Sequence, residues 1–145
     1  MDILFSVDRA DYNPDWPVIK SASARALIVS GGKMALIYIS RDKVYAIPGG
    51  RLVEGDSPLE ALLREVKEET GLVIRPETVK EFGATLIRRK DILDDGIYEQ
   101  LNLHYVCEVQ EQRVERNLTD REKDAGYELA FISVDDAIKA NEQSI

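Results

Sequence analysis

The order of apolar and polar positions predicts two groups of β-strands separated by one long helix. Short apolar runs bounded by glycine, proline or polar turns occupy the first third of the chain and return in its second half. Runs of this kind are typical of strands, which we predict at residues 21–30, 34–39, 44–47, 78–87, 98–109 and 127–132.

Two of these strands differ in how they are expected to be buried. The run at 34–39 is apolar on both faces, so we expect it in the middle of a sheet, after a hairpin turn at Gly31-Gly32. Residues 98–109 alternate instead, which predicts a half-buried strand antiparallel to its neighbour. One face carries Leu101, Leu103, Tyr105, Cys107 and Val109, and the other carries Asn102, His104 and Glu108.

The helix predicted between the two groups of strands has clear ends. Ser57 can cap its first turn, and Glu60 three residues later completes a capping box. Pro58 falls on the first helical position, and Gly71 suits the left-handed residue that closes a helix. The apolar face of this helix is formed by Leu59, Leu62, Leu63 and Val66.

The predicted elements favour an α/β fold. We expect an α/β/α sandwich whose central mixed sheet lies between the long helix and a second helix at 134–141, capped by Ser133 with Ala137 and Ile138 inward. The polar segment 110–126 reads as a long loop, and such loops are often functional.

The first twenty residues form an extension to a domain that we place at 21–145. This extension is irregular in pattern and contains Phe5, Tyr12 and Trp16. Because a free tail rarely carries such large apolar groups, we expect it to pack on the domain, form an edge strand, or contribute to a homodimer.

Composition narrows the class of protein. A chain of 145 residues with 44% hydrophobic residues supports one domain with a core, and a net charge of −8 argues against nucleic-acid polymers or anionic membranes as partners. The single cysteine, Cys107, excludes an internal disulfide. With no long apolar run or secretion signal in the sequence, we expect a cytoplasmic protein.

Three glutamates of the predicted helix share a second face. Glu65, Glu68 and Glu69 stand at helical spacing, so their carboxylates repel one another unless a cation lies between them. Mg²⁺ prefers such oxygen ligands together with substrate phosphates. On the helix alone, a solvated acidic face is the simpler interpretation.

The surrounding residues resemble the Nudix box, the signature of the Nudix hydrolases. The pattern covers residues 50–72: Gly50 begins it, and Arg64-Glu65, Val66, Glu68-Glu69, Gly71 and Leu72 all occupy their expected positions. Asp56 departs from it, because the family has Glu there. The order of elements also resembles the Nudix fold over nearly all of the chain.

The resemblance implies a set of metal ligands. By their positions in the box, Glu65, Glu68 and Glu69 are the expected ligands of Mg²⁺ or Mn²⁺, with Glu69 and Glu65 ahead of Glu68. A backbone carbonyl of Gly49 or Gly50 is a further candidate ligand. Arg64 is expected to orient one of these glutamates through a bidentate pair. A site of this kind is expected to be exposed.

The candidate base and substrate contacts lie outside the box. Because the base varies within the family and is often an acidic loop residue, we choose Glu122, followed by Glu128 and Glu108. A solvated charge is an equally good reading of each. Candidate substrate contacts are Arg88, Arg89 and Tyr45, although the two arginines could instead balance the acidic segment 91–96.

The resemblance implies a pyrophosphohydrolase that cleaves a nucleoside diphosphate derivative. The alternatives are a Nudix-fold module that senses a nucleotide without cutting it, and an acidic interaction domain whose box is accidental. The three intact glutamates count against the sensing module. Residues typical of ADP-ribose or dinucleoside polyphosphate hydrolysis are not evident after the box, so the sequence leaves the substrate open.

Overall fold

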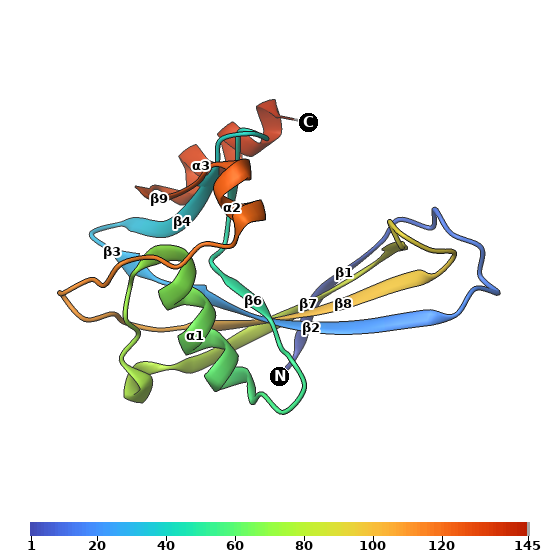
Figure 1. Cartoon of the computed structure of the whole chain (residues 1–145), viewed down its shortest axis with the longest axis horizontal. Coiled ribbons are helices and arrows are strands. Elements are labelled where there is room, and N and C mark those ends of the chain that lie inside the picture. The colour runs from blue at the N-terminus through green and yellow to red at the C-terminus, as the bar shows by residue number, and fades with distance from the viewer. Residues whose placement is uncertain (145) are drawn as a thin grey trace.

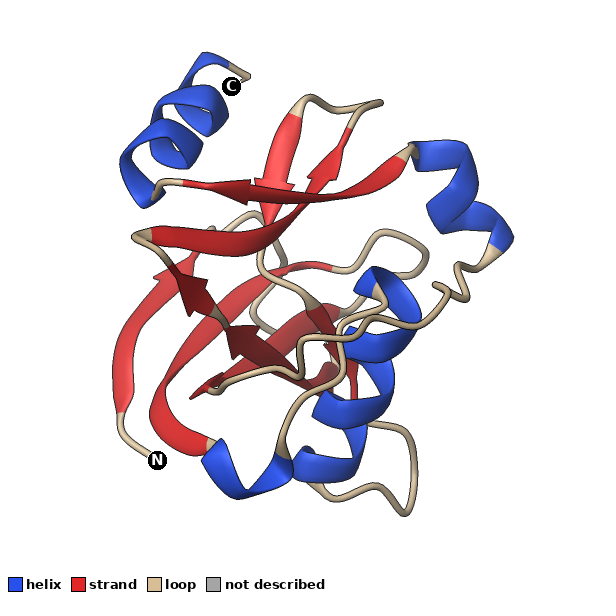
Figure 2. Cartoon of the chain, turned by 90° about the vertical axis from the view of Figure 1, so that its left-hand side faces the viewer, coloured by secondary structure: helices blue, strands red, loops and turns tan. Residues whose placement is uncertain are grey.

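The structure, a computed structural model, describes residues 1–144. Within these residues the strands form two sheets (Figures 1 and 2). The five-stranded sheet has the order β1 (Ile3–Asp8), β7 (Lys80–Lys90), β8 (Ile97–Val106), β2 (Val18–Leu27) and β6 (Gly49–Arg51). The four-stranded sheet consists of β3 (Val29–Ser30), β4 (Lys33–Ile39), β5 (Val44–Ala46) and β9 (Tyr127–Ile132).

The five-stranded sheet is mixed. β1 runs parallel to β7, β7 antiparallel to β8, β8 parallel to β2, and β2 antiparallel to β6. The predicted α/β class with a central mixed sheet is therefore confirmed, although the strands divide between two sheets. In the second sheet β4 pairs with β3, β5 and β9, which confirms its predicted central place.

The long helix α1 (Pro58–Thr70) begins and ends as its sequence predicts. The Ser57 hydroxyl accepts the Glu60 N–H at 3.2 Å, the Glu60 carboxylate accepts the Ser57 N–H, and Gly71 closes the helix with φ 77°. Leu62 and Val66 are fully buried. Leu59 is exposed, contrary to expectation, because it lies at the start of the helix, where the first buried residue is Ala61.

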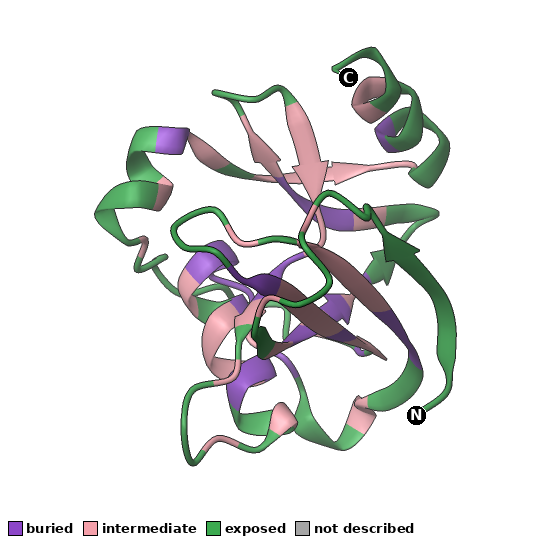
Figure 3. Ribbon diagram, turned by 90° about the vertical axis from the view of Figure 1, so that its right-hand side faces the viewer, coloured by how far each residue is buried: buried purple, intermediate pink, exposed green. Residues whose placement is uncertain are grey.

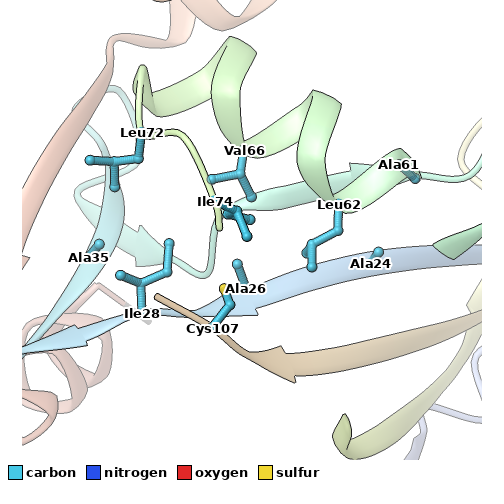
Figure 4. Packing of buried hydrophobic residues seen from close by; sticks show 10 residues of the cluster. All are labelled: Ala24, Ala26, Ile28, Ala35, Ala61, Leu62, Val66, Leu72, Ile74 and Cys107. Atoms are coloured by element: carbon cyan, nitrogen blue, oxygen red, sulfur yellow. The ribbon is translucent and has the colours of Figure 1, made fainter. Parts of the chain in front are cut away.

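The main core lies between α1 and the strands beneath it. Figure 4 shows side chains from α1 pointing toward those of β2 and toward Cys107, which follows β8. The buried cluster consists of Ala24, Ala26, Ile28, Ala35, Ala61, Leu62, Val66, Leu72, Ile74 and Cys107. Cys107 is thus a core residue, as its apolar position in the sequence indicated.

The remaining helices are η1 (Pro76–Thr78), α2 (Asp120–Ala125) and α3 (Val134–Gln143). Ser133 caps α3 as predicted, and Ala137 is buried, but Ile138 is exposed. The helix contacts β5, where the Asn141 amide bonds both the N–H and the carbonyl of Tyr45. This contact holds the helix against β5 through a polar side chain, and Ile138 remains exposed to solvent.

Three local features of the structure were not predicted. Residues 49–51 lie outside every predicted strand but form the short strand β6, which pairs with β2. Residues 110–126 contain α2, whose first turn is capped by Thr119. Asn102 is buried, so the polar face of β8 is covered. The pairing of β6 and the covering of Asn102 depend on distant segments, which a local pattern does not show. The helix α2 has a local signal instead, because Thr119 and Glu122 form a capping box.

Candidate active site

A cavity of about 500 Å³ lies where the two sheets, α1 and α2 meet. Its walls combine three kinds of side chain. Acidic groups come from Glu65, Glu69 and Glu122, basic groups from Arg25, Arg51 and Arg121, and aromatic or amide groups from Tyr98, Gln100 and Tyr127. Gly49 and Gly50 complete the wall beside the helix. The cavity therefore brings charges of both signs together at one end of the Nudix-like helix.

Glu69 is the buried acid of this cavity. Its exposed fraction is 5%, so the predicted ligand is buried and not exposed. One carboxylate oxygen accepts the Gly49 N–H at 3.3 Å. Burial raises the pKa of Glu69 to about 8, opposed by the Arg25 charge and reinforced by Glu122 and Glu65. A buried carboxyl whose charge is so little compensated is a candidate ligand for a cation.

Glu65 lies beside Glu69 and is partly buried. Burial, followed by the neighbouring Glu68 carboxylate, raises the pKa of Glu65, while Arg64 lowers it. Glu68 itself does not line the cavity, and its backbone carbonyl accepts the Asn117 N–H at 2.7 Å. The structure thus brings two of the three box glutamates to the cavity wall and leaves Glu68 outside it.

The Glu65 side chain packs against the backbone of Gly50. A Cβ at this position would lie 2.5 Å from the Glu65 Cδ. We expect Gly50→Ala to displace the Glu65 carboxylate at little cost to the fold, because that side chain can swing away. Turnover should fall about 10- to 100-fold. The turnover rate and the unfolding temperature of Gly50→Ala would be measured beside those of the control variant Gly96→Ala. A wild-type turnover rate for Gly50→Ala would contradict the expectation.

Gly49 contacts two charged residues of the cavity, Glu69 and Arg25, through its backbone. Its backbone has φ 145°, and a Cβ there would collide with the Ala24 carbonyl, so glycine is required. Its N–H donates to Glu69, and its carbonyl accepts Arg25 Nη1 at 3.2 Å. The carbonyl predicted as a metal ligand is therefore held by Arg25.

Arg64 forms its bidentate pair with Asp56 and not with a box glutamate, which corrects our expectation. The two bonds measure 3.0 and 2.9 Å, whereas the contact to Glu65 is 3.5 Å. Asp56 also accepts the Val53 N–H, and the Arg64 guanidinium lowers the pKa of its carboxyl. The residue that departs from the box pattern is thus the one that fixes Arg64.

Glu122 reaches the cavity from α2. Its carboxylate accepts the Thr119 N–H at 2.9 Å in a capping box, which orients the side chain at the start of the helix. Of the other candidate bases, Glu128 is exposed on β9 outside the cavity wall, and Glu108 faces Arg75 at 3.7 Å. Among the three, the structure brings Glu122 alone to the box glutamates.

The candidate substrate contacts Arg88, Arg89 and Tyr45 do not line the cavity. Arg88 pairs with Glu99 on the adjacent strand, with Nε 3.0 Å from the carboxylate. Arg89 stacks on the Tyr98 ring at 4.6 Å, and the Tyr45 ring packs on Tyr38. Their positive and aromatic groups are thus engaged in contacts within the chain.

The cavity is lined by other residues that the sequence analysis did not predict. Arg25, Arg51 and Arg121 supply the basic wall, and Tyr98, Gln100 and Tyr127 the remainder. Of these residues, only Arg25 could have been identified from the sequence. It is a charged residue within a strand of small residues at 22–27, and a charge in such a position needs a partner. The other positions become neighbours only when the two sheets meet.

Comparison with known proteins gives the family. The family described as the NUDIX domain matches residues 20–144, which is most of the chain. The chain belongs to the Nudix hydrolase family. Members of this family generally use a divalent metal and act on nucleoside diphosphate derivatives. The predicted resemblance is thereby confirmed.

Solved Nudix structures share the fold. A NUDIX hydrolase from Nitrosomonas europaea matches with a TM-score of 0.58 and 24% identity, covering 87% of this chain and 80% of that one. A MutT NUDIX hydrolase from Burkholderia pseudomallei gives 0.60 and 18%, covering 86% and 98%. A structure described as a UDP-X diphosphatase gives 0.54 and 22%, covering 87% and 63%.

A curated relative matches over a short segment. The 8-oxo-dGDP phosphatase NUDT18 of Mus musculus is 49% identical over 45 residues, which are 29% of this chain and 14% of that protein. The match therefore spans a small part of the relative's length. Separately, no helix within residues 1–144 of this Nudix hydrolase is both long and apolar enough to cross a membrane.

The cavity fits a divalent cation by the chemistry of its donors. No three carboxylate, histidine or cysteine side chains among the described residues form a closed ligand group. Mg²⁺ at phosphate-handling sites takes one or two carboxylates, with water and substrate phosphates completing the shell. Glu65 and Glu69, which raise each other's energy when both are charged, match that requirement.

Burial of Glu69 predicts a pH dependence of stability in the metal-free enzyme. The pKa of its carboxyl is about 8 in the folded state, against an ordinary value of 4.5 in the unfolded chain. Between pH 4.5 and pH 8 the folded state therefore binds the proton more tightly than the unfolded state does. The free energy of unfolding should therefore fall as pH rises through this window, by at most about 5 kcal/mol. Denaturation in chelator should show this slope in the wild type and a reduced slope in Glu69→Gln; equal slopes would contradict it.

Proposed function

We propose that this Nudix hydrolase is a metal-dependent pyrophosphohydrolase that cleaves the diphosphate linkage of a nucleoside diphosphate derivative. The observation that carries the proposal is the convergence of Glu65, Glu69 and Glu122 on a cavity that arginines also line. Water adds to one phosphorus, the bridging P–O bond breaks, and a nucleoside monophosphate and a phosphorylated second product leave.

Each acidic residue has a proposed role in this reaction. Glu65 and Glu69 hold Mg²⁺ or Mn²⁺, which when bound neutralises phosphate charge and makes water easier to deprotonate. Glu122 accepts the proton of the attacking water, since its carboxylate faces the cavity and is held by the Thr119 N–H. Arg64 positions the loop before the helix through Asp56.

The basic wall supports an anionic substrate. Arg51 and Arg121 line the cavity. They can face the phosphates of a diphosphate and stabilise the charge that develops on the leaving group. Arg25 is bound to the Ile47 and Gly49 carbonyls, so its role is to fix the glycine segment and to offset Glu69.

Two further residues of the cavity lining, Gln100 and Tyr98, support a nucleoside as part of the substrate. Gln100 Nε2 donates to Ser23 Oγ and Asn102 Oδ1, both at 3.0 Å. These bonds orient the amide, so its carbonyl is the acceptor that remains for an N–H on a base edge. Tyr98, whose ring already carries the Arg89 guanidinium, lies beside Gln100 in the cavity lining and adds aromatic surface there. The similar proteins named for UDP-X and 8-oxo-dGDP agree with a nucleoside diphosphate compound.

A nucleotide-sensing module that does not cut its ligand is the second candidate. It requires the same cavity but no positioned base. The presence of Glu122 beside the box glutamates favours hydrolysis over sensing. A cytoplasmic location remains a prediction from the sequence.

A product screen tests the proposal. Purified protein would be incubated with a panel of nucleoside diphosphate derivatives and Mg²⁺ or Mn²⁺, and products would be separated by ion-exchange chromatography. We expect at least one compound to give a nucleoside monophosphate and a phosphorylated partner, only with metal. Metal and nucleotide that raise the unfolding temperature without any product would favour the sensing module instead.

A further inference from the structure

Tyr127 lines the cavity, and the proposed reaction gives it no role. It is the first residue of β9 and is separated by one glycine from α2, the helix that carries Glu122. Within residues 1–144 its hydroxyl has no hydrogen-bond partner, and the oxygen is not sealed from solvent. A largely buried phenol usually finds a partner in the protein. The Tyr127 hydroxyl is therefore available to a molecule that enters the cavity.

The backbone around Tyr127 holds its ring in place. The Tyr127 carbonyl accepts Arg116 Nη1 at 2.7 Å, and the residue pairs with Ile39 of β4. The preceding Gly126 has φ 76°, its carbonyl accepts the Ser40 N–H at 3.1 Å, and a Cβ there would collide with the Ser40 hydroxyl. Figure 3 shows that α2 is mostly exposed but buried in its last turn, where it meets β9. The fold thus positions the ring without a hydrogen bond from its own hydroxyl.

Four charged side chains of the cavity lie near enough to act on the phenol. Burial raises the pKa of Tyr127, and the Glu69 and Glu122 carboxylates raise it further. Arg121 and Arg25 act in the opposite direction and more weakly. The phenol therefore lies within electrostatic reach of both a proposed metal ligand and the proposed base. Because even an unperturbed phenol keeps its proton at neutral pH, the hydroxyl is a hydrogen-bond donor there.

A neutral donor suits this position better than a cation. A guanidinium beside Glu69 and Glu122 would pair with the carboxylates, and their charge would no longer be available to a metal ion or to the attacking water. A phenol leaves that charge in place and can still offer its proton to an oxygen of the substrate. During phosphoryl transfer negative charge is spread over the equatorial oxygens of phosphorus, so a fixed donor at one of them stabilises the transition state.

From these features we propose that Tyr127 is a catalytic residue whose hydroxyl donates a hydrogen bond to an equatorial oxygen of the phosphorus that water attacks. The proposal rests on the proposed hydrolase function. Tyr127 and Glu122 line the same cavity, and an in-line attack puts the base and the water opposite the leaving group, so the equatorial oxygens are the nearer acceptors. The phenol keeps its own proton. The proton of the water goes to Glu122, and the electron pair of the broken P–O bond leaves with the departing phosphate.

Tyr127→Phe tests the proposal, because it removes one oxygen and keeps the ring. With the compound that the wild type hydrolyses fastest, we expect kcat to fall about 10- to 100-fold, as for loss of one hydrogen bond to a charged group. KM and the Mg²⁺ concentration that gives half the maximal rate should stay within about threefold, because the bond strengthens only as charge develops. Tyr38→Phe is the matched control. Tyr38 lies on the adjacent strand β4 outside the cavity wall, so its loss of a hydroxyl should not change kcat.

The outcomes separate this role from the proposed function. A kcat of Tyr127→Phe within about threefold of the wild type would overturn the role of Tyr127 alone. A raised KM with unchanged kcat would also overturn it, since the hydroxyl would then bind the substrate and its transition state equally. A wild type that hydrolyses no compound of the panel would overturn the proposed function and this role together.

A fluorinated tyrosine separates hydrogen bonding from a structural effect. A tyrosine with several ring fluorines at position 127 keeps the hydroxyl but has a phenol of lower pKa. We expect the wild-type rate where this phenol is protonated, and a loss of rate at a lower pH than in the wild type, because an ionised phenol cannot donate. A pH profile of kcat that coincides with that of the wild type would overturn the proposal.

Discussion

Glu69→Gln is expected to lower turnover on the order of 10³-fold. Glutamine keeps the size of the side chain and can still accept the Gly49 N–H, but it removes the buried negative charge that a cation would neutralise. Loss of metal-assisted charge stabilisation is worth several kcal/mol in the transition state. The measurement is the rate of product release at saturating Mg²⁺, compared with the wild type.

The control for this variant is Glu128→Gln. Glu128 is exposed on β9 and does not line the cavity, so its neutralisation should leave the rate unchanged. The metal-free Glu69→Gln protein should be at least as stable as the wild type above pH 8, because it no longer buries a charged carboxylate. A rate within a few-fold of the wild type would remove Glu69 from the metal site.

Glu122→Gln is expected to lower turnover about 10²- to 10³-fold with little change in metal affinity. The substitution isolates the charge, because glutamine can also complete the capping box with Thr119 and so keep α2 in place. The rate would be measured across a Mg²⁺ titration, which separates the maximal rate from the metal requirement.

Two outcomes distinguish a base from a ligand at this position. If Glu122→Gln shifts the Mg²⁺ dependence and recovers at high metal, then Glu122 binds the cation and the base is elsewhere. An unaltered rate would exclude both roles. Glu108→Gln provides the matched control, since Glu108 faces Arg75 away from the cavity and its loss should not affect turnover.

The helix and its acidic face were predictable because their signals are local. Ser57, Glu60 and Gly71 fix the ends of α1 within one turn, and helical spacing alone puts Glu65 and Glu69 on one face. The box adds a fixed spacing that few other sequences share. These residues needed no information from distant parts of the chain.

The rest of the candidate site depends on contacts between distant segments. Arg64 selects Asp56 because the loop before the helix folds back on it, and Arg25 meets Gly49 through the pairing of β2 and β6. The burial of Glu69 likewise results from packing around the helix. No local pattern could have shown that Arg88 would be paired with Glu99.

The most direct test of the account is hydrolysis in oxygen-18 water. The compound that is hydrolysed fastest in the product screen would be incubated with Mg²⁺ in this water. The masses of both products would then be measured by mass spectrometry. The account predicts one oxygen-18 atom in one of the two phosphorylated products, and on the order of 10³-fold less labelled product in the same time from Glu69→Gln. Unlabelled products, or label that appears equally with Glu69→Gln, would contradict water attack at a metal site held by Glu65 and Glu69.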